Sequence, residues 1–283
     1  MERKSFTRVT MALDIVRKIQ EGPYSGYHEL AIVKHQIDLH DIISVEDSSG
    51  TGIECDDPRV PCDESNICWK AVDLIKNECS VDKNVKIHIS KRIPVMGGMA
   101  GGSANAATML ELLNELWGLG LREERLMSLG RKLGMDVPYF FKGQTALDSE
   151  ATCCLVPLPT SLRFVFVIAV PDFGVSTSEA YRGIDYSVIN RQHEKTEKMQ
   201  RCFLENDWKG VLESMHNDFE TSVFRSYPRL RELKAQLLEA GCMQAIMTGS
   251  GSTVIGIAEN LQKAEDIRRK IDCRTIVSST LEK

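Results

Sequence analysis

The sequence lacks the features that mark membrane, secreted and metal-stabilised proteins. Its longest strongly apolar run, Phe164 to Val170, is far shorter than the roughly 20 residues that a membrane-spanning helix needs. No apolar block follows the charged N-terminal residues, so no secretion signal is expected. The nine cysteines are scattered and include no Cys-x-x-Cys pair, which predicts neither a disulfide framework nor a zinc site. We therefore expect a cytoplasmic protein that does not interact with membranes.

Neither aromatic residues nor charges of one sign are abundant. Aromatic residues make up 6% of the chain, and 40 acidic against 35 basic side chains give a net charge of -5. A net acidic chain offers nucleic-acid phosphates no electrostatic attraction, so a nucleic-acid partner is not expected. The 283 residues, 42% of them hydrophobic, are enough for one large or two compact globular domains.

Strand-like and helix-like patterns follow one another through the first half of the chain. Apolar and polar residues alternate over 6–15, 29–39 and 85–93, which predicts strands, with a turn at 21–26. Residues 64–76 and 123–133 have the apolar spacing of helices, and Ser65 or Asp63 is a candidate N-cap of the first of these two.

The second half of the chain shows the same mixture. Strands are predicted at 163–170, 243–247, 253–257 and 275–277, and helices at 228–240 and 264–271. The region 187–208 is polar and helical, and its charge-rich part, 191–201, is interpreted as a solvated face. The change of pattern near residue 157 predicts two domains, 1–157 and 158–283.

A glycine-rich segment between a strand and a helix is the most informative local pattern. Residues 96–102 read MGGMAGG, and a good helix is predicted from Ser103 onward. Glycines let successive backbone N–H groups turn toward one point, and a helix N-terminus adds partial positive charge there, an arrangement that suits a phosphate. A flexible turn before an ordinary helix is the alternative. Neither a Walker loop nor a GxGxxG pattern is present.

Two further segments carry candidate functional residues. Asp136 precedes Pro138 and an aromatic run, which places a polar group against an edge of the core. A helix cap or a turn residue is the commoner role of such an aspartate. Residues 248–252 read TGSGS, which is either a β-turn or a second glycine-rich loop that faces the first.

These segments occur in the order found in a known superfamily. PVMGGMAGGSANAA at 94–107, GMDVPYFF at 134–141 and MTGSGSTVIG at 247–256 resemble the three motifs of the GHMP small-molecule kinases. Within that superfamily, GYHEL at 26–30, DESNICWKA at 63–71 and STSEAYRGID at 176–185 resemble the 4-diphosphocytidyl-2-C-methyl-D-erythritol kinase family. The resemblance extends from about residue 8 to 258 and rests on six ordered motifs.

The resemblance implies a fold, a reaction and a cofactor. The fold would be α+β with two domains, the N-terminal one like domain 2 of ribosomal protein S5 and the C-terminal one ferredoxin-like, and the active site would lie in the cleft between them. The reaction would be transfer of the γ-phosphoryl group of ATP, with Mg²⁺, to a hydroxyl of the acceptor, giving a 2-phosphate in non-mevalonate isoprenoid precursor biosynthesis. The metal ligands are not identified, and the protein is expected to be a monomer or a homodimer.

The resemblance also implies roles for individual residues. Asp136 would be the catalytic base, and Arg8 stands where the family has a lysine that supports the reacting groups. The nucleotide phosphates would be held by Gly97, Gly98, Ala100, Gly101, Gly102 and Ser103, with Asn66, Lys91 and Asn105 around the rest of the adenine nucleotide. The acceptor would meet Thr10, Tyr27, His28, Asp136, Tyr181, Thr248, Gly249, Ser250 and Gly251, with Tyr181 stacked on its cytosine ring.

Several residues depart from the family pattern. Arg8 replaces lysine, Thr10 replaces asparagine, Met96 and Ala100 replace glycines, and Ala104 replaces a serine. Arginine keeps a positive charge but spreads it over a rigid fork, so the first exchange is not conservative. The departures leave two alternatives open, a paralogue that phosphorylates a different alcohol and a catalytically silent protein that binds nucleotides.

Overall fold

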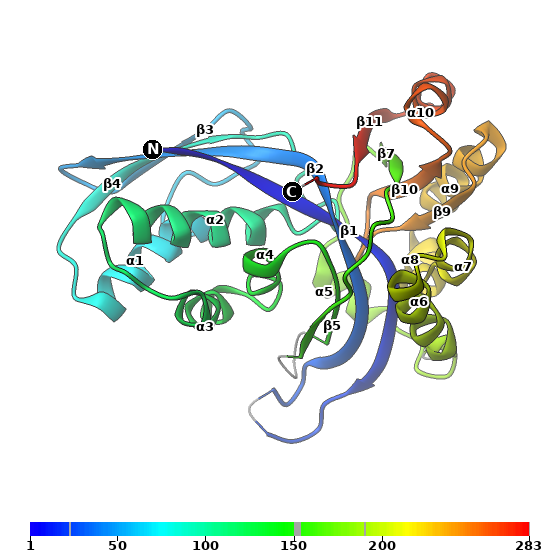
Figure 1. The fold of residues 1–283 in the computed structure, drawn as a ribbon, viewed down its shortest axis with the longest axis horizontal. Helices are drawn as coiled ribbons and strands as arrows, with labels where there is room; N and C mark the ends of the chain where they lie inside the picture. Colours follow the sequence, from blue (N-terminus) through cyan, green and yellow to red (C-terminus); the bar gives the residue numbers. More distant parts are fainter. Residues whose placement is uncertain (23, 150–153, 190, 283) are drawn as a thin grey trace. The chain divides into compact units, whose positions relative to one another are not determined.

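Two long strands, β1 (Glu2–Lys18) and β2 (His28–Ser48), each contribute residues to both of the compact units of the chain (Figure 1). The computed structural model describes residues 1–22, 24–149, 154–189 and 191–282. Unit 1 comprises residues 1–7, 39–95 and 100–143, and unit 2 comprises residues 8–38, 96–99 and 144–283. The two units are defined by contacts between residues, and each is made of segments that alternate along the chain. They therefore do not test the domain boundary predicted near residue 157, which stays a prediction.

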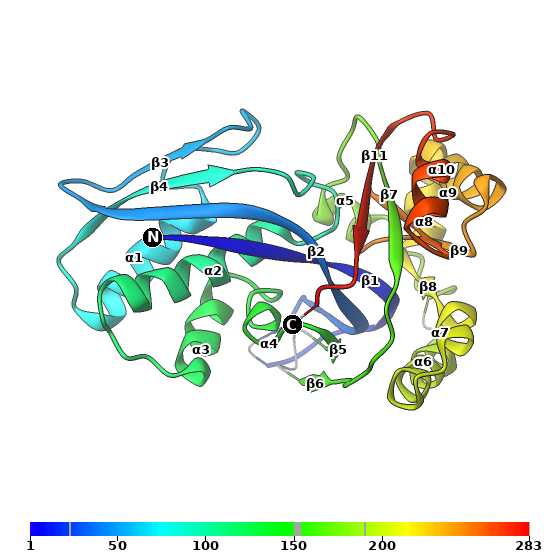
Figure 2. The ribbon, with the colours of Figure 1, turned by 45° about the horizontal axis from the view of Figure 1, so that its top comes forward.

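Unit 1 is a sheet with helices packed on it. Its elements are β3 (Gly52–Cys55), α1 (Ile67–Cys79), β4 (Asn84–Ser90), α2 (Gly101–Leu116), α3 (Glu123–Leu133) and α4 (Tyr139–Lys142). Residues 42–48 of β2 pair antiparallel with β4, which pairs in parallel with β3. Val85, Ile87 and Ile89 alternate with exposed residues along β4 and pack in one core with α1, α2 and α3 (Figure 2).

Unit 2 contains a four-stranded antiparallel sheet in the order β11-β7-β10-β9. Its elements are β5 (Thr145–Asp148), β6 (Leu155–Pro157), β7 (Val165–Val170), α5 (Thr177–Arg182), α6 (His193–Glu205), α7 (Trp208–Ser214), β8 (His216–Asn217), α8 (Phe219–Ser226), α9 (Pro228–Ala240), β9 (Gln244–Met247), β10 (Val254–Ala258), α10 (Leu261–Arg268) and β11 (Arg274–Ser279). Helices lie between β7 and β9 and between β10 and β11 in the chain. The strand order with these two connections is that of a βαββαβ, ferredoxin-like domain, as expected.

Helix α9 shows how the sequence forms this part of the core. Leu230, Leu233 and Leu237 follow the spacing of one helix face and are fully buried against the four-stranded sheet. Pro228 occupies the first turn, where its missing N–H costs nothing, and Gly241 ends the helix with a φ of 115°. The predicted bounds 228–240 are therefore confirmed, as are those of the helix at 123–133.

The predicted caps of α1 were wrong. The N-cap is Asn66, whose Oδ1 accepts a hydrogen bond from the N–H of Cys68 at 2.9 Å. Asp63 instead accepts from the N–H and the hydroxyl of Ser65, forming a local turn before the helix. All three residue types suit an N-cap, so composition could not choose among them.

The interpretation of 191–201 as a solvated face was also wrong in part. Thr196 and Met199 on α6 are fully buried, and the hydroxyl of Thr196 donates to Asp14 of β1 at 2.5 Å. The other oxygen of Asp14 lies 2.9 Å from Nε2 of His216, whose Nδ1 lies 2.8 Å from the carbonyl of Ser214. The helix is therefore attached to the sheet through a buried polar network.

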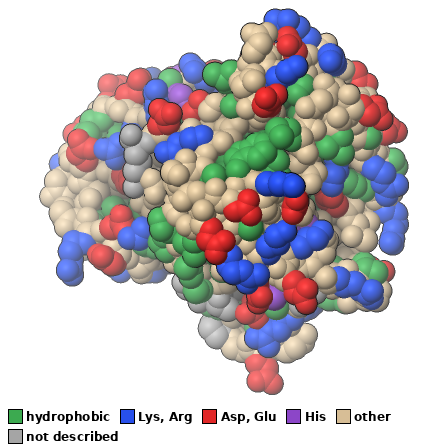
Figure 3. Space-filling model, turned by 45° about the vertical axis from the view of Figure 1, so that its right-hand side comes forward, with side chains coloured by type: hydrophobic (Ala, Val, Ile, Leu, Met, Phe, Trp, Pro, Cys, Tyr) green, Lys and Arg blue, Asp and Glu red, His purple; other side chains and the backbone are tan. Residues whose placement is uncertain are grey.

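Charge is spread over the surface. On the face that Figure 3 shows, Lys and Arg side chains are interspersed with Asp and Glu side chains. Within the described residues, no helix combines the length and the apolar character that crossing a membrane would take.

The buried network fixes the protonation of two groups. Burial alone would raise the pKa of Asp14, but hydrogen bonds from His216 and Thr196 and the positive charge of His216 outweigh it and lower that pKa below 3.8. Burial would lower the pKa of His216, but the hydrogen bonds to Asp14 and to the carbonyl of Ser214 raise it above 6.5. Elsewhere in unit 2, burial lowers the pKa of His35 to about 3.

We predict opposite pH dependences for the stabilising effects of these two histidines. The raised pKa of His216 gives stabilisation that is complete below pH 6.5 and is lost as the pH rises through the folded-state pKa. The Tm difference between wild type and His216→Gln should therefore be largest near about pH 5.5 and narrow toward about pH 9. Differential scanning calorimetry over this range measures it.

His35→Gln is the matched control. Because the pKa of His35 is lowered, its contribution is present above pH 6.5 and is lost as the pH falls toward 3. The Tm difference for His35→Gln should narrow toward acid. A common direction for both variants would contradict the assignment of the two protonation states.

Candidate active site

The glycine-rich segment that the sequence singles out belongs to two units. Residues 96–99 group with unit 2, whereas the segment from Ala100 onward groups with unit 1. The candidate site residues divide in the same way. Unit 1 holds Asn66, Lys91, Ala100, Gly101, Gly102, Ser103, Asn105 and Asp136, and unit 2 holds Arg8, Thr10, Tyr27, His28, Gly97, Gly98, Tyr181, Thr248, Gly249, Ser250 and Gly251.

In unit 1 the segment ends in the N-terminus of α2, two residues earlier than predicted. The N-cap position is Ala100, no described side chain caps the helix, and its first turn has no acidic residue. The N–H groups of the first turn and the helix dipole therefore favour an anion at this end. The amides of Gly101, Gly102 and Ser103 belong to this turn, as the phosphate interpretation requires.

The side chain of Lys91 lies next to Gly101, the first residue of α2. A Cβ built on Gly101 would be 3.2 Å from Nζ of Lys91 and 2.9 Å from the side chain of Ile93, so only glycine fits there without a shift. The ammonium group of Lys91 donates to Asp41 at 2.7 Å and to the carbonyl of Ile93 at 2.8 Å. Asp41 also accepts from the N–H groups of Arg92 and Ile93, and so fixes the chain that enters the glycine segment.

The two candidate asparagines of unit 1 are buried and hydrogen-bonded within the protein. Asn66 caps α1 and donates through Nδ2 to the carbonyl of Pro61 at 2.6 Å. Asn105 accepts through Oδ1 from the hydroxyl of Ser5 at 2.8 Å. Their roles toward a nucleotide stay predictions.

Asp136 is half-buried in the turn between α3 and α4. The next residue, Val137, is fully buried against Ala106 and Ala107 of α2, which attaches this turn to the phosphate-favouring helix. A Cβ built on Gly134, two residues before Asp136, would lie 4.0 Å from Oγ of Ser103. The structure therefore brings the Asp136 turn and the first turn of α2 together within unit 1.

In unit 2, β1 supplies a buried cation next to the glycine segment. Arg8 is 4% exposed, and its Nη1 donates to the carbonyl of Gly98 at 2.8 Å and to the hydroxyl of Thr10 at 3.2 Å. The N–H of Thr10 in turn donates to the hydroxyl of Thr248 at 2.9 Å. Arg8 and Thr10, the two departures on this strand, therefore bind each other and both glycine-rich loops.

The two glycine-rich loops pack backbone against backbone. A Cβ built on Gly98 would lie 2.2 Å from the carbonyl oxygen of Thr248, and one on Gly249 would lie 2.6 Å from that of Gly98. The N–H of Thr253 also donates to the carbonyl of Gly97. The expectation that the TGSGS loop faces the first loop is confirmed, and both glycines are required by this close approach.

The candidate base-binding residues form an aromatic stack. The rings of His28 and Tyr181 lie 4.5 Å apart at 26°, and Nε2 of His28 is 2.7 Å from the hydroxyl of Tyr186. Burial, with the nearby charge of Lys18, lowers the pKa of His28, which keeps the ring neutral near pH 7. Tyr27 is outside the stack, 53% exposed, with its ring edge-on to that of Tyr24.

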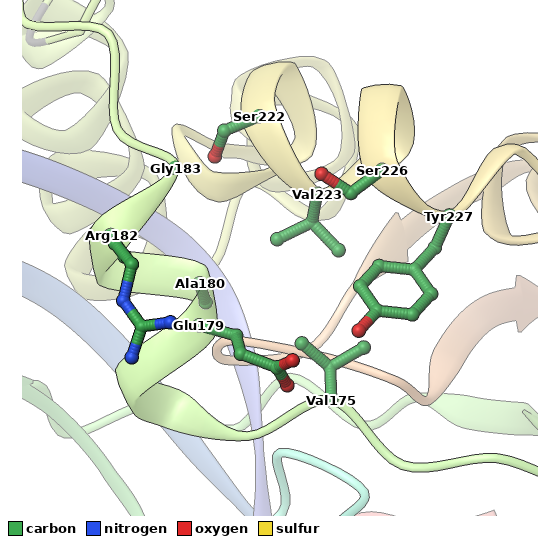
Figure 4. A pocket seen from close by; sticks show the side chains of 9 residues that line it. All are labelled: Val175, Glu179, Ala180, Arg182, Gly183, Ser222, Val223, Ser226 and Tyr227. Carbon is green, nitrogen blue, oxygen red and sulfur yellow. The ribbon is translucent and has the colours of Figure 1, made fainter.

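A cavity of 310 Å³ lies between α5 and α8 in unit 2 (Figure 4). Its walls come from Val175, from α5 with Glu179 and Arg182, from α8, and from Tyr227 just after α8. Glu179 and Tyr181 are two residues apart on α5, so their side chains point in nearly opposite directions. Glu179 faces the cavity, and Tyr181 points away from it. Thr177 at the start of α5 lies 3.3 Å, hydroxyl to hydroxyl, from Ser250.

Sequence reasoning missed three side chains that hold this site. Asp41 fixes the entry to the glycine segment, and Asn217 binds the carbonyl of Gly249 in the TGSGS loop and that of Met247 just before it. Glu220 accepts from the N–H of Met247. Their only signal in the sequence is polarity at positions that become buried or half-buried, which a single sequence does not reveal.

Both residues that stand where the resemblance expects glycines adopt glycine-like backbone conformations. The φ angles are 56° at Met96 and 54° at Ala100, both in the left-handed region. A residue with a Cβ costs roughly 1 to 2 kcal/mol there. These substitutions therefore place strain at the start of the glycine segment and within it.

We predict that Ala100→Gly raises the free energy of unfolding by about 1 kcal/mol, because it removes a left-handed alanine at little cost in contacts. Ala235→Gly, on an exposed position inside α9, is the matched control. It should lower the free energy by about 1 kcal/mol, since glycine is the poorer helix former. Urea unfolding measures both changes, and equal losses for the two variants would refute the left-handed assignment.

Two family models match the chain. The model of the GHMP kinases N terminal domain matches residues 66–144, and that of the GHMP kinases C terminal domain matches residues 199–277. A 4-diphosphocytidyl-2-C-methyl-D-erythritol kinase from Alkaliphilus metalliredigens is 36% identical over 94% of this chain and 90% of its own length. One of the same name from Clostridium botulinum is 33% identical over 96% of this chain and 95% of its own length.

Solved structures show the same similarity. The crystal structure of a 4-(cytidine 5'-diphospho)-2C-methyl-D-erythritol kinase aligns over 99% of this chain and 98% of that one, with a TM-score of 0.79 and 26% identity. A homoserine kinase from Cytophaga hutchinsonii aligns over 98% and 94% with a TM-score of 0.73 and 18% identity, a likeness of fold alone. With both family models matched and relatives above 30% identity over almost its whole length, the chain belongs to the GHMP kinases and, within them, to the 4-diphosphocytidyl-2-C-methyl-D-erythritol kinase family.

Proposed function

We propose that this kinase transfers the γ-phosphoryl group of ATP to the 2-hydroxyl of 4-diphosphocytidyl-2-C-methyl-D-erythritol. The observation that carries the proposal is the 36% identity to a kinase of that name over almost the whole of both chains. Two features of the structure support it. In unit 1, the turn that carries Asp136 packs on α2, whose N-terminus has no side-chain cap. In unit 2, the buried guanidinium of Arg8 binds the carbonyl of Gly98.

Asp136 acts as the general base in this proposal. Its carboxylate orients the acceptor hydroxyl and takes its proton as the hydroxyl oxygen attacks the γ-phosphorus, and ADP leaves with the electron pair of the broken bond. The packing of Val137 on α2 supports this role, because it fixes the turn that carries Asp136 beside the helix end that favours phosphate.

Arg8 stabilises negative charge on the transferring group. A buried guanidinium held by Gly98 and Thr10 is already oriented, so little reorganisation accompanies the reaction. Because arginine is always protonated, it acts here only as a charge and a donor.

The residues present fit a Mg²⁺ ion that arrives with the nucleotide. Among the described residues, no three His, Cys, Asp or Glu side chains group as a ready-made metal site. Mg²⁺ in kinases is typically held by substrate phosphates, water and one or two protein oxygens, and the hydroxyl of Ser103 in unit 1 would supply such an oxygen. When bound, the ion neutralises charge on the phosphates.

The stacked rings of His28 and Tyr181 support a flat base as part of the acceptor. The cytosine ring stacks on this aromatic pair, and the loop at 248–251 meets the acceptor's phosphates. Thr10 replaces the family's asparagine, and its hydroxyl accepts a hydrogen bond from Arg8, so its contribution to acceptor choice is indirect. The cytoplasmic location and the monomeric or homodimeric state stay predictions.

We predict that Asp136→Asn lowers kcat by about 1,000-fold, since an amide cannot take the proton, while the KM for ATP changes less than about twofold. The assay follows the phosphorylated acceptor by mass spectrometry with ATP and Mg²⁺. Asp266→Asn on the surface of α10 is the matched control and should keep wild-type rates. Retained activity in Asp136→Asn would refute its role as base, and wild-type activity only with other alcohols would refute the proposed acceptor.

We predict that Arg8→Lys lowers kcat/KM by about tenfold, although it restores the family's residue. The shorter reach and compact charge of lysine cannot keep the carbonyl of Gly98 and the hydroxyl of Thr10 together as the guanidinium does. Steady-state kinetics with both substrates measure the change, with Arg268→Lys on α10 as the control. A gain in rate would mean instead that arginine impairs the native site.

A further inference from the structure

The amide side chain of Asn217 is a buried contact beneath the TGSGS loop. Asn217 is 3% exposed, and its Nδ2 donates to the carbonyls of Met247 at 2.7 Å and of Gly249 at 2.8 Å. Its Oδ1 accepts from the N–H of Phe219 at the start of α8 at 3.0 Å. One proton of the amide nitrogen is therefore used on the loop and the other on the last residue of β9 before it, and the oxygen holds the amide plane.

The backbone that carries Asn217 is held firmly. Strand β8 pairs in parallel with β1, with Asn217 opposite Leu13. The next residue, Asp218, donates through its N–H to the carbonyl of Leu13 and accepts from the N–H of Ile15 at 2.9 Å. These contacts leave the amide of Asn217 in one position relative to the strand that carries Arg8 and Thr10.

The contact with Gly249 sets the direction of the next N–H. The peptide bond between Gly249 and Ser250 is trans, so its C=O and its N–H point in opposite directions. Because the carbonyl of Gly249 points toward Asn217, the N–H of Ser250 points away from it. Gly249 adopts the left-handed φ of 56° that this orientation uses.

We infer that Asn217 is a positioning residue that turns the Ser250 N–H toward an anionic group of the acceptor. The inference rests on the proposed function, in which the loop at 248–251 meets the acceptor's phosphates. A correctly aimed amide donor gives affinity for a phosphate oxygen, whereas a reversed peptide would present the carbonyl oxygen of Gly249 and repel it. Asn217 thereby controls acceptor binding without touching the acceptor.

Asn217→Asp tests this, because it keeps the size of the side chain but removes its two donors. A carboxylate oxygen facing the carbonyls of Met247 and Gly249 repels both, and the Gly249–Ser250 peptide rotates. We expect the KM for the acceptor to rise about tenfold or more, with the KM for ATP unchanged within about twofold. Equal changes in both KM values, or no change in that of the acceptor, would overturn the inference.

Asn114→Asp is the matched control. The amide of Asn114 in unit 1 likewise bridges backbone groups, accepting from the N–H of Leu121 at 2.8 Å and donating to its carbonyl at 3.0 Å. It should lower the Tm, as Asn217→Asp does, but leave the KM for the acceptor unchanged. If Asn217→Asp does not fold, Asn217→Ala replaces it as the test variant. We expect the same rise in the KM for the acceptor and the same unchanged KM for ATP.

A binding measurement separates this inference from the proposed function. In protein labelled with ¹⁵N-serine, titration with cytidine 5'-diphosphate should shift the Ser250 amide signal in the wild type, and about tenfold more ligand should be needed in Asn217→Asp. Such a result without phosphorylation of the acceptor would refute the proposed function and support the inference. Phosphorylation of the acceptor without a shift of the Ser250 signal would support the proposed function and refute the inference.

Discussion

The two glycine-rich loops of unit 2 approach each other backbone to backbone, at Gly98 and at Gly249. A single added methyl group on Gly98 would lie 2.2 Å from the carbonyl oxygen of Thr248, so the loops can meet only because both positions are glycine. Two further contacts of unit 2 are made to the same two glycines. Arg8 binds the carbonyl of Gly98, and Asn217 binds that of Gly249. Strand β1 therefore holds both loops, directly through Arg8 and through its pairing with β8.

This arrangement explains how a departure from the family pattern is accommodated. The guanidinium of Arg8 is not isolated, because it binds the loop carbonyl and the hydroxyl of Thr10. The two substitutions on β1 are thus partners in one contact. Met96 and Ala100 are different. Their positive φ angles retain the backbone conformation of the family's glycines, which costs more free energy for a residue with a Cβ. Arg8 and Thr10 thus compensate for each other through a hydrogen bond, whereas Met96 and Ala100 lower the stability of the fold.

The sequence supports prediction of the elements better than of the contacts between them. The bounds of α3 and α9 follow from apolar spacing, capping glycine and proline, which act within a few residues. The two glycine loops and Asp136 are recognisable because their motifs are local. The choice of Asn66 as cap, the burial of Thr196 and the role of Asn217 depend on residues distant in the chain, which no local pattern contains.

Each unit also contains a lysine that is paired with an aspartate away from water. Nζ of Lys34 lies 2.7 Å from Asp148 with its side chain 0% exposed, and Lys91 lies 2.7 Å from Asp41 with its side chain 7% exposed. Breaking such a pair leaves an uncompensated buried charge, so both amines stay enclosed in the native state. An acylating reagent that labels surface amines within minutes reaches these two only when the surrounding structure opens. The labelling rate of Lys91 thus reports the opening of unit 1, and that of Lys34 reports the opening of unit 2, in a single native chain.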